Sequence, residues 1–69
     1  AVTGIEAALN LVVIKTYPGM ASAVAAGVDS AAIPGALGCV AGDDTIFIAC
    51  RSVEAASAAA TELDGIIGK

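Results

Sequence analysis

Histidine and tryptophan are absent from this 69-residue chain, and basic residues are scarce. Without histidine, the chain lacks the commonest metal ligand and the commonest general base of proteins. The three basic residues are Lys15, Arg51 and Lys69, and seven acidic residues bring the formal net charge to −4. Binding to phosphates or to anionic lipids depends on lysine and arginine. The composition therefore argues against a nucleic-acid-binding or membrane-binding surface on this chain.

Aromatic side chains are nearly absent as well, since only Tyr17 and Phe47 are present. Even so, 58% of the residues are hydrophobic, and alanine supplies much of that fraction. A domain of this length buries only about 60% of its unfolded surface, which is less than the apolar content calls for. An interface between subunits is the expected outlet for the excess. We therefore expect one domain, residues 1–69, that forms an oligomer and not a stable monomer.

The two cysteines, Cys39 and Cys50, both fall on a predicted hairpin. Their spacing alone permits a disulfide, but we expect no signal peptide and therefore two reduced, buried thiols in a cytoplasmic protein. Charged residues and prolines interrupt every apolar stretch before it reaches about 18 residues. No transmembrane helix is expected.

The first half of the chain predicts two strands that could pair as a hairpin. Residues Val2 to Ala8 form a weakly patterned strand, and Leu11 to Thr16 are apolar and rich in β-branched side chains. Asn10, which precedes the second strand, is a typical turn residue. Tyr17-Pro18-Gly19 ends the second strand, and Pro18 suits the first turn of a following helix.

That helix is predicted to have one apolar face and one polar face. Met20, Val24 and Val28 recur every fourth residue, which indicates an apolar stripe of about three turns. Ser22 and Asp29 are seven positions apart and share a face away from that stripe.

The second half of the chain predicts a hairpin followed by another helix. Strand-like runs from Ala36 to Ala41 and from Ile46 to Cys50 flank the turn Gly42-Asp43-Asp44. Ser52 is a suitable N-cap, and Glu54 in the first turn would complement the helix dipole. The apolar stripe predicted for this helix contains Val53, Ala56, Ala60, Leu63 and Ile67.

The predicted element order is therefore β-β-α-β-β-α, an α+β fold. A small antiparallel four-stranded sheet with two helices packed on one face would bury both apolar stripes. The outer face of the sheet and the tips of the hairpins would then be left for partners.

Asp43 and Asp44 are the most informative charges in the sequence. Adjacent carboxylates repel each other, so a fold that keeps both at one turn often supplies a cation. Here the scarcity of basic residues favours a cation from outside the chain. One interpretation is a solvated turn without function, because aspartate is common in turns. A second is a Mg²⁺ site, because RNA-dependent polymerases bind Mg²⁺ at a Gly-Asp-Asp hairpin turn. A polymerase, however, also needs further carboxylates and basic residues that this chain lacks.

A third interpretation of the doublet is a site for an organic cation. The planar guanidinium group carries five N–H donors and matches carboxylates in a bidentate geometry. Asp29, on the polar face of the first helix, offers a further carboxylate that could meet an α-amino group.

Two motifs give the chain a family resemblance: Thr16-Tyr17-Pro18-Gly19, and the run Gly-Cys-Val-Ala-Gly-Asp-Asp-Thr-Ile-Phe from Gly38 to Phe47. With the helix that ends near Asp29, they resemble the C-terminal domain of the bacterial arginine repressor family over essentially the whole chain. The resemblance implies trimers, two of which stack into a hexamer with L-arginine bound between them as corepressor. It implies no enzymatic activity and no cofactor. Operator DNA would be bound by an N-terminal winged helix-turn-helix domain that is absent from this chain.

The resemblance also implies a set of arginine-binding residues. Asp43 and Asp44 are expected to be the main ligands, and Asp43 is expected to meet the guanidinium partly across the trimer interface. Asp29 matches a family aspartate that faces the ligand. Cys39 and Ala41, on the strand before the turn, are expected to lend backbone groups.

Some positions depart from the family pattern. Ser22 stands where members often carry glutamine, so a water is expected to bridge it to the ligand. Cys39 replaces a common threonine, and Lys15 falls at a variable position where we expect a solvated strand-end charge. The implied function is the transcriptional regulation of arginine metabolism. The alternatives are a plain oligomerisation module without a small-molecule ligand and a metal-dependent enzyme.

Overall fold

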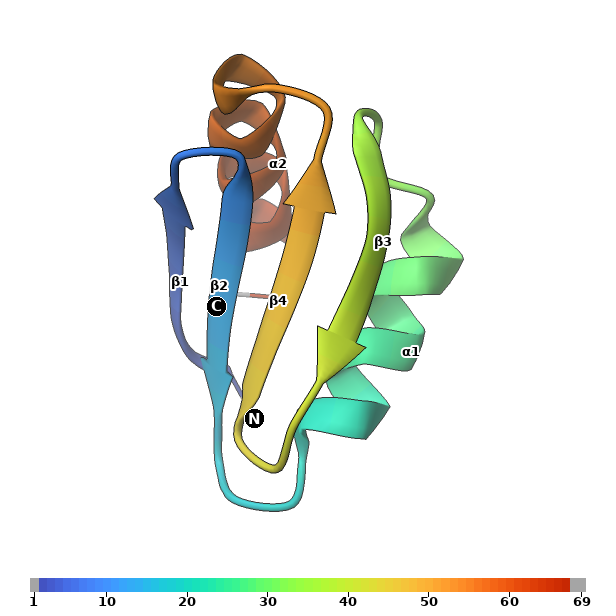
Figure 1. Ribbon diagram of the computed structural model, residues 1–69. Coiled ribbons are helices and arrows are strands. Elements are labelled where there is room, and N and C mark those ends of the chain that lie inside the picture. Colours follow the sequence, from blue (N-terminus) through green and yellow to red (C-terminus); the bar gives the residue numbers. More distant parts are fainter. Residues whose placement is uncertain (1, 68–69) are drawn as a thin grey trace.

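A computed structural model describes residues 2–67, which form four strands and two helices (Figure 1). In chain order the elements are β1 (Val2–Ala8), β2 (Leu11–Thr16), α1 (Ala21–Ala31), β3 (Ala36–Ala41), β4 (Thr45–Cys50) and α2 (Val53–Ile67). This is the β-β-α-β-β-α order that the sequence predicts. The α+β fold class is confirmed.

The four strands form one antiparallel sheet in the order β1-β2-β4-β3. The two hairpins, β1–β2 and β3–β4, join through the central strands, where Leu11 pairs with Ala49 and Lys15 pairs with Thr45. The central strands β2 and β4 carry the fully buried side chains of the sheet, while β1 and β3 form its edges.

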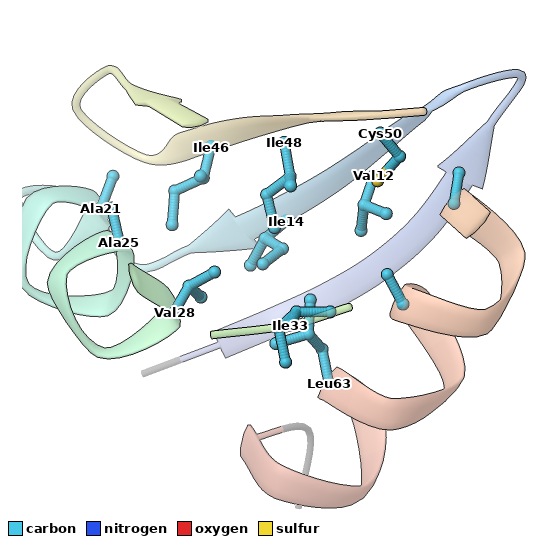
Figure 2. Close-up of a cluster of buried hydrophobic side chains, with 12 residues drawn as sticks. Val12, Ile14, Ala21, Ala25, Val28, Ile33, Ile46, Ile48, Cys50 and Leu63 are labelled. Atoms are coloured by element: carbon cyan, nitrogen blue, oxygen red, sulfur yellow. The ribbon is translucent and has the colours of Figure 1, made fainter. Parts of the chain in front are cut away.

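Both helices pack on the same face of the sheet, with α1 behind β3 and α2 behind β1 and β2 (Figure 1). Side chains of a strand point alternately to the two faces of a sheet, so every second residue of β2 and β4 meets the helices. Figure 2 shows these side chains directed toward residues of α1 and α2. The fully buried members with the largest side chains are Ile14, Ile46, Ile48, Leu63, Val12 and Cys50.

The buried face of α1 differs by one position from the predicted stripe. Ala21, Ala25 and Val28 are the buried residues of this helix. Met20 is the N-cap and is 38% exposed, and Val24 is only partly buried. The prediction is right for Val28 and wrong for the other two positions, because alanines next to Met20 and Val24 create an overlapping apolar row. Small side chains let the helix approach the sheet closely.

Pro18 does not open α1 as predicted, because the helix begins only at Ala21. Residues 17–19 instead form a turn, in which Gly19 has a φ of +83°. Glycine adopts this left-handed conformation without the steric cost that a Cβ atom brings. The connection between β2 and α1 is therefore a tight turn and not an extension of the helix.

The start of α2 agrees with the prediction, because the Oγ of Ser52 accepts a hydrogen bond from the N–H of Ala55 at 3.0 Å. Such a cap satisfies one of the backbone donors that a helix start leaves unpaired. The buried residues of α2 are Ala56, Ala59 and Leu63. Val53 was expected in the stripe but is 54% exposed. Again, neighbouring alanines hide the true position of the buried face.

The sheet face opposite the helices is covered by no other element of residues 2–67, and we call it the open face. It carries Leu11, Val13, Val40 and Phe47. Val40 is 71% exposed and Phe47 is 47% exposed. A row of apolar residues on a free sheet face is unusual in a small monomer and is typical of an interaction surface.

Within the described residues, neither helix is long and apolar enough to cross a membrane.

Candidate functional site

The turn between β3 and β4, which carries Asp43 and Asp44, is held against the connection between β2 and α1. The Asp43 carbonyl oxygen accepts hydrogen bonds from the N–H groups of Gly19 (3.0 Å) and Ala21 (3.3 Å). The Asp44 carbonyl oxygen accepts one from the N–H of Thr16 at 2.8 Å. Figure 1 shows the two connections side by side at one end of the sheet. Because these bonds use only backbone atoms, both carboxylates remain available to bind other groups.

The hairpin turn is itself tight, since the N–H of Gly42 donates to the Thr45 carbonyl oxygen at 2.8 Å. With its backbone bonded both internally and to the neighbouring connection, the turn presents Asp43 and Asp44 from a rigid base. This is the hairpin that the sequence predicted around Gly42-Asp43-Asp44.

The Asp44 carboxylate lies beside a cation of its own chain. Its Oδ1 accepts a hydrogen bond from the Thr45 hydroxyl at 2.9 Å and is 3.7 Å from Nζ of Lys15. The Lys15 ammonium also donates to the Thr45 hydroxyl, and both charged side chains are about half exposed. The Thr45 hydrogen bond, followed by the Lys15 charge, holds the pKa of Asp44 below its ordinary value.

Sequence reasoning missed this partner of Asp44 and described Lys15 as a solvated strand-end charge. Lys15 is about half exposed, so it is partly solvated as expected, but it also has Asp44 as a partner. The scarcity of basic residues favours an external cation for both aspartates, yet Asp44 pairs with Lys15 of its own chain. The register that pairs Lys15 with Thr45 would have revealed it, but the sequence alone does not fix that register.

Asp43 differs from its neighbour. Its side chain is exposed, and no hydrogen bond or ion pair joins its carboxylate to any other residue between positions 2 and 67. Among residues 2–67, Asp44 therefore has a cationic partner and Asp43 has none.

A second cluster lies on the helix side of the sheet, between α1 and β3. The Cys39 thiol donates a hydrogen bond to Oδ1 of Asp29, with sulfur and oxygen 3.5 Å apart. Both residues line a hollow of about 110 Å³, whose apolar wall includes Val28, Ile33 and Ile48. Partial burial, and then the Asp29 carboxylate, raise the pKa of the Cys39 thiol. The thiol is therefore protonated at neutral pH.

Both cysteines are free thiols. Cys50 is buried as predicted, and burial raises the pKa of its thiol. Cys39 is only partly buried, so the expectation of two buried thiols is wrong for this residue. Cys39 lines the hollow between α1 and β3, which leaves its side chain partly accessible.

The six predicted site residues do not converge on one pocket within a single chain. Asp29 and Cys39 meet on the helix side, because Cys39 pairs with the buried Ile48. The Asp44 carboxylate lies with Lys15 and Thr45, which alternate with buried neighbours and so project from the open face.

Three of the predicted residues belong to neither cluster. Ser22 is exposed on α1, Ala41 is exposed at the end of β3, and Asp43 is exposed in the turn. In the region from residue 2 to residue 67, no group of three or more His, Cys, Asp or Glu side chains is arranged to hold a metal ion.

The sequence was compared with known proteins. The family profile described as "Arginine repressor, C-terminal domain" matches residues 1–65. A relative named "Arginine repressor" from Heliobacterium modesticaldum is 54% identical over 57 residues, which is 83% of this chain and 38% of the relative. Another of that name, from Symbiobacterium thermophilum, is 43% identical over 67 residues, covering 97% of this chain and 45% of the relative.

A third relative with the same name, from Syntrophomonas wolfei, is 44% identical over 68 residues, which is 99% of this chain and 44% of the relative. The chain thus spans less than half the length of these curated relatives.

Proposed function

The chain belongs to the family of arginine repressor C-terminal domains, and on this premise we propose that it senses L-arginine and assembles the repressor. In this proposal L-arginine binds between two trimers as corepressor, and the resulting hexamer regulates the genes of arginine metabolism in the cytoplasm. No catalytic role and no cofactor are proposed.

The observation that best supports arginine binding is the exposed Asp43 carboxylate, which lacks a cationic partner among the described residues. This carboxylate stands on a turn with a bonded backbone. A guanidinium is the side-chain-sized cation that matches carboxylates best, through two parallel N–H···O bonds. A site that is rigid before the ligand arrives loses less conformational entropy on binding.

The separation of the two clusters favours a ligand held between subunits. One arginine molecule would meet Asp43 and Asp44 of one chain while its α-amino group meets Asp29 of another. Cys39 and Ala41 would contribute backbone groups from β3, and Ser22 would act through a bridging water. The hollow between α1 and β3, lined by Asp29 and Cys39, is where we propose that part of the ligand lies.

Assembly is proposed from the open face. Val40 and Phe47 expose apolar surface there, and a chain this short gains stability when it buries such surface against other copies. Trimers, and hexamers made from two trimers, are the assemblies that we propose.

One observation favours the alternative of a plain oligomerisation module. Lys15 already pairs with Asp44, so one carboxylate of the doublet has a cation from its own chain. In this alternative the assembly is complete without a ligand, and Asp43 is merely solvated.

Operator binding is proposed for a part of the repressor outside this chain. With three basic residues against seven acidic ones, the chain can release few counterions from DNA phosphates. We expect no mobility shift of operator DNA by this chain alone, with or without L-arginine.

Calorimetric titration separates arginine binding from its alternative. L-Arginine should bind, whereas L-citrulline, which has nearly the same shape but a neutral ureido group, should bind far more weakly. Asp43→Asn and Asp44→Asn should each weaken arginine binding more than Asp29→Asn does. Removing one partner of a buried charge pair typically costs about 2–5 kcal/mol. Equal heats for arginine and citrulline would remove the guanidinium from the proposal.

A further inference from the structure

We infer that Lys15 competes with the ligand for Asp44, and so sets both the affinity for arginine and the stability of the unliganded assembly. This inference rests on the proposed function. It assigns to Lys15 a role in tuning the site, without direct contact between Lys15 and the ligand.

The backbone places Lys15 next to the turn that carries Asp44. The Asp44 carbonyl oxygen is bonded to the N–H of Thr16, the residue that follows Lys15. Lys15 also pairs with Thr45 across the central strands, next to Asp44 in the chain. The pairing of β2 with β4 thus brings the two residues together, and Nζ of Lys15 lies 3.7 Å from Oδ1 of Asp44.

The neighbours of Lys15 support the same contact. On its other side Lys15 pairs with Gly4, which has no side chain to compete for the ammonium. On the near side, the Thr45 hydroxyl accepts from Lys15 and donates to Asp44, so it bridges the pair.

Lys15 has no substitute among the described residues. Arg51, the other basic residue between positions 2 and 67, follows the far end of β4, and its N–H donates to the Gly35 carbonyl oxygen. A strand advances about 3.3 Å per residue, which separates Arg51 from the turn by about 20 Å. Removal of Arg51 changes the net charge as removal of Lys15 does, but it leaves the turn untouched.

Two opposite effects follow from this arrangement. A ligand cation that approaches Asp44 meets a carboxylate that is already paired and an ammonium that repels it, so Lys15 weakens binding. In the unliganded assembly, Lys15 reduces repulsion between aspartates of neighbouring chains. Lys15 therefore lowers the coupling free energy between arginine binding and assembly. This one free energy describes both how assembly changes arginine affinity and how arginine changes assembly.

The experiment uses Lys15→Met, which keeps the length of the side chain and removes its charge. Arginine affinity should rise about two- to fivefold, the size expected for a half-exposed ion pair. The unliganded protein should dissociate at a higher protein concentration than the wild type. Lys15→Arg should behave like the wild type, and Arg51→Met serves as the control for net charge. Titration calorimetry and sedimentation equilibrium report the two quantities.

A double variant isolates the pair. In an Asp44→Asn background, Lys15→Met should no longer change the unliganded assembly, because its partner is gone. If Lys15→Met and Arg51→Met give the same arginine affinity and the same assembly, the inference is wrong.

The sedimentation measurement also separates this inference from the proposed function. If the wild type binds no arginine, the proposed function fails. The effect of Lys15→Met on unliganded assembly still decides whether Lys15 neutralises Asp44 there.

Discussion

The carbonyl oxygen of Asp43 accepts a hydrogen bond from the N–H of Gly19, which joins the acidic turn to the connection that precedes α1. The two segments are separated in the chain by a helix and a strand. The segment Thr16-Tyr17-Pro18-Gly19 thus supplies backbone donors, from Thr16 and Gly19, that hold the turn Gly42-Asp43-Asp44. The position of the carboxylates therefore depends on the backbone conformation of Gly19.

Replacement of Gly19 should test that dependence. The positive φ of Gly19 strains any residue with a Cβ atom, so Gly19→Ala should destabilise the fold by about 1 kcal/mol. Gly27→Ala is the matched control, since Gly27 lies inside α1 with open space around its Cα. That variant should stabilise by about 0.4–1 kcal/mol. Urea denaturation at one fixed protein concentration measures both, and equal effects of the two substitutions would count against the account.

The thiol of Cys39 should react slowly with alkylating reagents at neutral pH, because its pKa is raised above the ordinary value. Asp29→Asn removes the charged carboxylate that accepts the thiol's hydrogen bond, so the pKa of Cys39 should fall and alkylation should become faster. Burial, the larger cause, persists in that variant, and the pKa should stay above normal. The rate of iodoacetamide labelling against pH, followed by mass spectrometry, gives both pKa values. If Asp29→Asn leaves the pH profile of the labelling rate unchanged, the Asp29 carboxylate does not raise the pKa of Cys39.

Asp44 should contribute to stability in a pH-dependent way. Its pKa is lower in the folded chain than in the unfolded chain, so the unfolded state takes up this proton first as the pH falls. The contribution is therefore complete above about pH 4, the ordinary value for aspartate, and is lost as the pH falls through the lower folded value. Asp44→Asn should show a shallower loss of stability than the wild type between about pH 5 and pH 2. Denaturation curves at several pH values measure this, and parallel pH profiles would contradict it.

The sequence predicted the fold well but placed several side chains wrongly, for physical reasons. The β-branched run from Leu11 to Thr16 predicts a strand, and the acidic turn at Asp43 predicts the hairpin between β3 and β4. Both local predictions are confirmed. Ser52 was recognised as a cap because capping depends on one side chain and nearby backbone. The buried faces of the helices are harder to predict, because alanines occur on more than one face of each helix and blur the apolar stripe.

The contacts of the site were the hardest part to predict. The pair formed by Lys15 and Asp44 depends on the register between β2 and β4, and the contact of Cys39 with Asp29 depends on how α1 lies across β3. Both are long-range results of packing, which no local pattern encodes.

The open face should be the surface through which copies of the chain associate. Phe47→Lys places a charge in the middle of this face and should shift the protein toward smaller species, while the fold remains intact. Val53→Lys is the control, because Val53 is similarly exposed but lies on α2, away from the open face. Sedimentation velocity combined with circular dichroism should report smaller species for the first variant only. If both variants keep the wild-type mass, the subunits associate through another surface.

The most direct test of the account is the mass of the wild-type chain in solution at micromolar concentration, measured by sedimentation equilibrium with and without L-arginine. Trimers and hexamers should be present without ligand, and arginine should increase the hexamer. The expected gain is about 2.7 kcal/mol per site at a hundredfold excess over Kd if separated trimers do not bind. A folded monomer under both conditions, or a hexamer fraction that does not respond to arginine, would contradict the account.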